Sequence, residues 1–218
     1  LLGPRTTLGH AIFIDDHPSI DWRAREDLSL LVDSGTSVAH CPSPFARYGH
    51  AMADFGRYHR AGVNLGFGTD VTPHNLIEEM RLAIILARVM ANNIKTTDAQ
   101  MVFHAATVGG AKSLLRDDLG RLEKGAKADL VMVDITQPIM RPAHDPLKSL
   151  IYHGADRAVK TVFIDGKLAV DNGSVVHLDM SDAAGRLEIA QQRMLKDVPN
   201  HDFLGREAKD ITPLSLNL

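Results

Sequence analysis

Three short apolar runs recur thirty residues apart in the sequence, and each ends in an ionisable side chain. The first run ends at His10, the second at His40, and the third at Asp70. This spacing leaves room for one helix between successive strands, which is the repeat of a parallel β/α structure. In a β/α barrel the active site lies at the carboxyl ends of the strands. We therefore expect these three side chains to converge on one site.

Helix signals between the runs support this alternation. Residues 27–32 and 51–61 are expected to be helical. Gly35 and Gly62 follow these segments, where a glycine commonly ends a helix in the left-handed conformation.

A long amphipathic helix is expected after Asp70, with an apolar face of Leu76, Met80, Ala83 and Ala87. Thr97 with Gln100 fits a capping box for the next helix. A last helix, over residues 111–115, would end this part of the chain.

The character of the sequence changes after residue 115. A turn-rich segment leads to the apolar run 130–133, and Asp165-Gly166 separates two further apolar runs as a hairpin turn would. A helix is expected over residues 181–196. The expected divisions are a barrel portion at 1–115, a β-sandwich segment at 116–180 and a C-terminal helix and tail at 181–218.

Composition narrows the class of protein. The 218 residues are 44% hydrophobic and 23% charged, with a formal net charge of -3, so nucleic acid is not an expected partner. No apolar stretch reaches the roughly 18 residues of a membrane span. Cys41 is the only cysteine, and the expected location is the reducing cytoplasm. We interpret its thiol as packed rather than nucleophilic.

Length and repeat count together predict a fragment. A complete eight-unit barrel takes about 250 residues, and at least about 200. Here the thirty-residue repeat is sustained for only three strands, and the sequence starts at Leu1 without an initiator Met.

Several motifs in order along the chain carry a family resemblance. They are Leu8-Gly9-His10, Val38-Ala39-His40-Cys41-Pro42-Ser43, Gly66-Phe67-Gly68-Thr69-Asp70, Ala105-Ala106-Thr107 and Asp118-Leu119-Gly120-Arg121-Leu122. The chain resembles the C-terminal portion of a metal-dependent amidohydrolase, close to the cytosine deaminase, adenosine-derivative deaminase and triazine hydrolase branch. The resemblance implies an α/β fold: the C-terminal part of a (β/α)8 TIM-type barrel with an appended small β-sandwich segment.

The resemblance also implies roles for the three strand-end residues. Asp70 matches the strand-8 carboxylate that binds the metal and exchanges a proton with the attacking water. His10 matches the strand-6 histidine that orients the nucleophile and stabilises the tetrahedral intermediate. His40 matches the strand-7 position, where contact with substrate is expected.

Other family residues have no counterpart in this sequence: the strand-1 His-x-His pair, the strand-5 histidine and the glutamate three residues after it. A catalytic zinc usually has about three protein ligands. The expected cofactor is one divalent ion, zinc with iron as the alternative, whose remaining ligands are absent from this chain. We therefore expect this fragment alone to be inactive.

The loops after the second and third strands are expected to select a small heterocyclic substrate. Arg47 offers a cation, Tyr48 a ring for stacking and Phe45 an apolar surface, while His74 follows Asp70 on the same side.

The predicted function is hydrolysis of a non-peptide C–N bond, foremost deamination of a purine, pyrimidine or triazine-like ring by metal-activated water. Hydrolytic removal of chloride or an alkylamine from a triazine uses the same machinery. A different class of protein also stays open: a non-catalytic truncated or assembly module, whose unpaired strand edge would recruit a partner. A paralogue without metal fits Asp70 and His10 less well. A homo-oligomer is expected.

Overall fold

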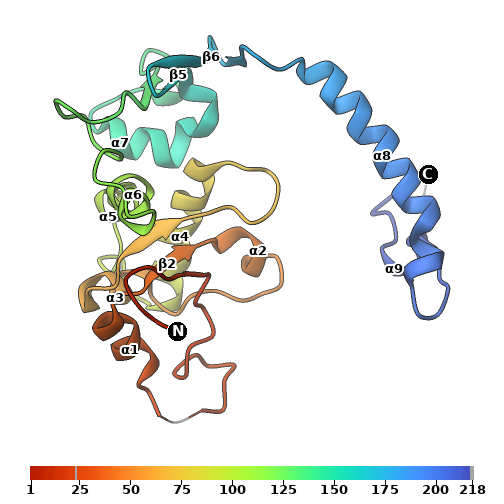
Figure 1. The fold of residues 1–218 in the computed structure, drawn as a ribbon, viewed down its shortest axis with the longest axis horizontal. Coiled ribbons are helices and arrows are strands. Elements are labelled where there is room, and N and C mark those ends of the chain that lie inside the picture. Colours follow the sequence, from red (N-terminus) through yellow and green to blue (C-terminus); the bar gives the residue numbers. More distant parts are fainter. Residues whose placement is uncertain (23, 217–218) are drawn as a thin grey trace. The chain divides into compact units, whose positions relative to one another are not determined.

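The computed structural model describes residues 1–22 and 24–216, and the chain divides into two compact units, Leu1–Gly173 and Ser174–Leu218. Figure 1 shows the strands that carry the strand-end residues inside the first unit. The domain boundaries expected from the sequence, near residues 115 and 180, stay predictions.

The three apolar runs form a parallel sheet, as predicted. Its strands are β1 (Thr7–Gly9), β2 (Ser37–His40) and β3 (Leu65–Phe67), in the order β1-β2-β3. Leu8 pairs with Val38, and Val38 pairs with Leu65. Within the described residues, these three strands do not close into a barrel. The fold is mixed α/β and matches part of a barrel.

The helices between the strands follow the predicted alternation. They are α1 (Asp27–Ser34), α2 (Pro42–Ala46), α3 (Phe55–Ala61), α4 (Leu76–Met90), α5 (Ala99–His104), the π-helix η1 (Ala105–Gly109) and α6 (Gly110–Ser113). Gly35 and Gly62 end α1 and α3 with left-handed φ angles of 67° and 99°, which confirms both predicted stops. The expected helix start at residue 51 is wrong, because residues 51–54 are not helical and α3 begins at Phe55.

The capping prediction at Thr97 is also wrong. Asp98 is the N-cap of α5, and its side chain accepts a hydrogen bond from the Met101 amide at 2.9 Å. Thr97 is instead fully buried, and its carbonyl accepts from the Arg88 side chain at 3.0 Å. The aspartate at the next position reaches the exposed helix end, where a capping side chain must lie.

The hydrophobic core lies between the sheet and α4. Met80, Ala83, Ile84 and Ala87 are buried on the helix, and Val38 is buried in the sheet. Burying a side chain such as Ile84 stabilises the fold by about 1.5–3 kcal/mol. The predicted apolar face is confirmed except at its start, since Leu76 is 37% exposed.

The rest of the first unit holds a small antiparallel sheet, in the region where the β-sandwich segment is expected. Strand β5 (Val159–Ile164) pairs with β4 (Leu130–Val133) and with β6 (Lys167–Asp171). Asp165 and Gly166 have φ angles of 49° and 75°, as the predicted tight hairpin turn requires. Between β4 and β5 lie η2 (Pro138–Met140), α7 (Pro146–Ser149), η3 (Leu150–Gly154) and η4 (Ala155–Ala158).

The second unit contains β7 (Ser174–Val175), α8 (Met180–His201) and α9 (Ala208–Ile211). The helix predicted over 181–196 exists and runs five residues further, to His201. In the part of the chain that the structure describes, no helix has the length and apolar character to span a membrane.

Candidate active site

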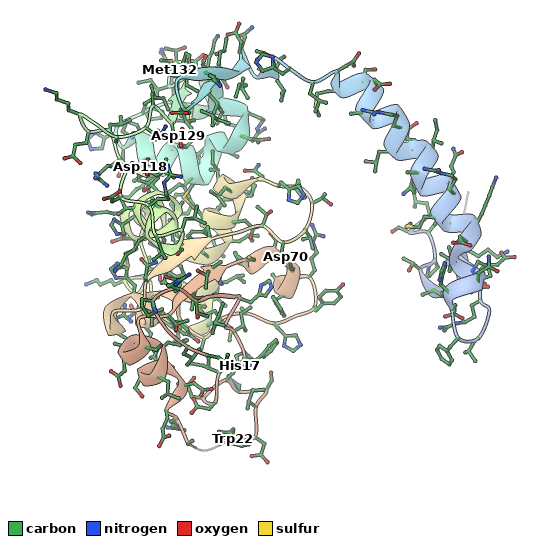
Figure 2. The ribbon with its side chains drawn as sticks, viewed as in Figure 1. His17, Trp22, Asp70, Asp118, Asp129 and Met132 are labelled. Carbon is green, nitrogen blue, oxygen red and sulfur yellow. The ribbon has the colours of Figure 1, made fainter. Side chains whose placement is uncertain are left out.

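His10, His40 and Asp70 lie at the carboxyl-terminal edge of the parallel sheet. His10 directly follows β1, His40 is the last residue of β2, and Asp70 follows β3 by three residues. The pairing continues to this edge, because the His10 amide donates to the Ala39 carbonyl at 2.8 Å and the Gly68 amide donates to the His40 carbonyl at 3.1 Å. Figure 2 shows Asp70 beyond the end of its strand. The three residues therefore lie at the same edge of the sheet, as their spacing in the sequence predicts.

His10 and Asp70 face one another. The His10 Nε2 atom lies 3.6 Å from the Asp70 Oδ2 atom, and their side chains are 27% and 47% exposed. Both residues have left-handed backbones, with φ angles of 66° and 60°. Such conformations cost a non-glycine residue about 1–3 kcal/mol and often occur at functional sites. The strand-end bends thus hold an imidazole and a carboxylate together while leaving both accessible to a small molecule.

His40 differs from this pair because it is buried. It is 3% exposed, and its ring lies 5.6 Å from the ring of Phe55 and 5.8 Å from that of Phe67. Burial, followed by the proximity of His10, lowers the pKa of His40 from 6.5 to about 3. His40 is therefore a neutral imidazole packed against two phenylalanine rings, and its burial leaves little surface for the substrate contact expected of it.

The donor atoms at this edge fit part of the ligand set of a metal site. Asp70 offers carboxylate oxygens, and the Nδ1 atoms of His10 and His40 are buried without a hydrogen-bond partner in the structure. Among residues 1–22 and 24–216, no group of three or more histidine, cysteine, aspartate or glutamate side chains is arranged to hold a metal ion. Asp70 can therefore supply one oxygen ligand, whereas a full ligand set requires other donors, and its role as a metal ligand stays a prediction.

The loop residues expected to select substrate lie in different surroundings. The Arg47 guanidinium donates to the Thr72 carbonyl at 2.7 Å and so ties the loop after β2 to the loop after β3. His74 Nδ1 shares a hydrogen bond of 2.8 Å with the Thr69 hydroxyl. Tyr48 is 80% exposed. Arg47 and His74 therefore order the loops around Asp70, and their predicted substrate contacts stay predictions.

Two residues that the sequence did not single out border this edge. Phe13 contacts Phe45, which in turn contacts His10 edge to face at a ring distance of 4.6 Å. Glu79 of α4 is only 1% exposed and accepts a hydrogen bond from the Ser43 amide at 3.0 Å. This bond fixes the start of α2, on which Phe45 lies. The only sequence signal for Phe13 was its position in the loop after a predicted strand end. No local pattern could predict the Glu79 contact, because Ser43 and Glu79 are 36 residues apart.

Cys41 is packed, as interpreted from the sequence. Its thiol is buried and donates a weak bond to the Ala39 carbonyl at 3.6 Å. Burial, with smaller effects from Asp70 and Glu79, raises the pKa of this thiol from 9.0 to about 11. A thiol that stays protonated near neutral pH is a poor nucleophile.

Comparison with known proteins decides the family. The family model described as the amidohydrolase family matches residues 1–169. The chain belongs to the amidohydrolase family. This confirms the resemblance carried by the motifs at His10, His40 and Asp70.

Individual relatives of this amidohydrolase are deaminases and a triazine-acting hydrolase. The 5-methylthioadenosine/S-adenosylhomocysteine deaminase of Haloarcula marismortui is 35% identical over 185 residues, covering 82% of this chain and 40% of the relative. A zinc-bound adenosine deaminase from Xanthomonas campestris is similar in structure, with a TM-score of 0.79 and 30% identity over 88% of this chain and 43% of that one. A zinc complex of atrazine chlorohydrolase from Arthrobacter aurescens gives a TM-score of 0.73 and 28% identity over 85% and 40%.

The chain thus spans about 40% of the length of the curated relatives that it matches. Two of these relatives were solved with zinc, and all three act on heterocyclic small molecules by their names.

Proposed function

We propose that the protein carrying this chain is a metal-dependent hydrolase that deaminates a heterocyclic small molecule, with adenine nucleosides as the first substrate class. The observation that carries the proposal is the 3.6 Å approach of His10 Nε2 to Asp70 Oδ2 at the carboxyl edge of a parallel sheet. Family membership supports the reaction class, and the names of the deaminase relatives support the choice of substrate.

The metal, zinc or alternatively iron, supplies an activated water when bound, because it lowers the pKa of that water to about 7. Asp70 would be one ligand of this ion. Its second carboxylate oxygen is free to accept the proton of the attacking water, and the 47% exposure of the side chain leaves room for both contacts. General base action of this kind contributes about 100- to 10,000-fold to the rate.

His10 holds the oxygen that adds to the ring carbon. Its Nε2 atom points toward Asp70, where it can donate a hydrogen bond to a developing negative charge. His40, which is buried at the end of the adjacent strand β2, shapes the pocket beside His10. Arg47, Tyr48 and His74 complete the proposed set of residues around the substrate, the first and last by ordering the loops beside Asp70.

The experiment is a product analysis with the natural full-length protein that contains this chain, purified with one equivalent of zinc. Adenosine, 5′-methylthioadenosine and atrazine are offered separately, and ammonia, chloride and the ring product are measured. Ammonia released with conversion of adenine to hypoxanthine supports the proposal. Chloride released from atrazine alone would favour the triazine reaction, for which the similarity to atrazine chlorohydrolase is the supporting observation. No product from any substrate would reject both.

A further inference from the structure

Four rings form a continuous series that leads away from His10; we call it the aromatic row. Phe45 lies 4.6 Å from His10, Phe13 lies 5.5 Å from Phe45, and His50 lies 5.3 Å from Phe13, all measured between ring centroids. Each contact is edge to face, the arrangement that aromatic pairs prefer. Phe13 is therefore two rings away from the imidazole that faces Asp70.

The segment that carries Phe13 is held on both sides. The Tyr58 hydroxyl donates to the Ala11 carbonyl at 2.9 Å, two residues before Phe13. The buried His17 accepts from the Ser19 amide at 3.1 Å through Nδ1, so its Nε2 donates to the Ala51 carbonyl at 3.2 Å. The His17 ring also contacts Phe13 at 4.9 Å. Phe13 is thus fixed by its neighbours before any ligand binds.

Phe13 remains 41% exposed despite these three ring contacts. An immobilised, half-exposed phenylalanine gives an apolar surface whose conformational entropy is already lost, so a ligand that covers it gains affinity at low cost. Asp16, three residues after Phe13, forms an ion pair with Arg57, and the Arg47 guanidinium donates one hydrogen bond to the Thr72 carbonyl. Phe13 and Phe45 offer apolar ring surface and no hydrogen-bond donor, so this part of the row suits an uncharged, apolar group better than a phosphate or carboxylate.

We infer that Phe13 is a specificity-determining residue, which contacts an uncharged apolar substituent of the heterocyclic substrate on the side remote from the reacting carbon. This inference rests on the proposed function. The ring carbon that loses its amino group lies at His10 and Asp70, Phe45 lies beside the ring, and the substituent extends to Phe13. Contacts far from the reacting carbon select among substrates that share the same reaction.

The test compares 5′-methylthioadenosine with adenosine, which differ in a methylthio group against a hydroxyl, on the zinc-loaded full-length protein. The variants are Phe13→Ala and Phe13→Leu, and the matched control is Phe103→Ala, because Phe103 on α5 is 42% exposed. The measured quantity is the ratio of kcat/KM for the methylthio substrate to that for adenosine.

Phe13→Ala is expected to lower this ratio about tenfold, mainly through KM of the methylthio substrate, in line with the 10- to 200-fold typical of one apolar group. Phe13→Leu should retain most of the preference and Phe103→Ala all of it. Equal ratios in the Phe13 and Phe103 variants would overturn the inference while leaving the proposed deamination intact. If the wild-type protein deaminates neither nucleoside, the proposed function fails and this inference fails with it.

Discussion

Two neighbouring glycines allow a sharp test of how η1 is packed against the strand that leads to Asp70. Gly109 and Gly110 have nearly the same helical backbone, with φ of -63° and -61°. Their surroundings differ. A Cβ atom on Gly109 would lie 2.0 Å from the Leu65 carbonyl oxygen of β3, whereas the nearest atom to a Cβ on Gly110 is the Ala105 carbonyl oxygen at 3.7 Å.

The two alanine substitutions should therefore have opposite effects on the free energy of unfolding. Gly109→Ala forces η1 away from β3, and overpacking of this kind costs about 1–3 kcal/mol or more. Gly110→Ala meets only an ordinary contact, so the lower backbone entropy of the unfolded chain should stabilise the protein by about 0.5–1 kcal/mol. The predicted difference between the variants is at least about 1.5 kcal/mol.

Urea unfolding followed by circular dichroism gives both values in one experiment. The slope with denaturant should be the same for the two variants, so that the midpoints report stability directly. A Gly109→Ala protein as stable as Gly110→Ala would refute the close packing of η1 on β3, the strand that leads to Asp70.

Three further predictions concern His40, Glu79 and Cys41, which are buried near the candidate site. Because burial lowers the pKa of His40 to about 3, the unfolded chain binds a proton that the folded chain excludes between pH 6.5 and 3. Stability should then fall by up to about 1.4 kcal/mol per pH unit below 6.5, and unfolding curves of His40→Asn should lack this component. Glu79→Ala removes the acceptor of the Ser43 amide and should cost about 1.5–3 kcal/mol in urea unfolding, whereas a smaller loss is expected for Glu79→Gln; equal losses would contradict the bond. Iodoacetamide should alkylate Cys41 at pH 7.5 at least about 100-fold more slowly in the folded than in the unfolded protein.

The strand order and the main helices could be predicted because their signals are local in the sequence. The spacing of His10, His40 and Asp70 marks three strand ends, and Gly35 and Gly62 adopt left-handed conformations that end helices at low cost. These signals depend only on a few neighbouring residues, so one sequence suffices to read them.

Features that depend on distant contacts could not be predicted in this way. Helix α2 has five residues and contains Pro42 and Pro44, so its sequence predicts a loop. The acceptor that fixes its start is Glu79, which is distant in the sequence. The choice between Thr97 and Asp98 as the cap of α5 depends on which side chain the fold buries. Phe13 gains its proposed role only through the contacts with Phe45 on α2 and with His50 in the loop that follows α2.

The central claim, that Asp70 is the carboxylate that binds the metal and accepts the proton, is tested most directly by the rate of zinc-dependent ammonia release from 5′-methylthioadenosine. The comparison uses the full-length protein with Asp70→Asn and with Asp33→Asn, an exposed aspartate on α1, as the matched control. The account predicts that Asp70→Asn lowers the rate at least about 1,000-fold, while Asp33→Asn leaves it unchanged. An Asp70→Asn protein that releases ammonia at the rate of the control would contradict the account.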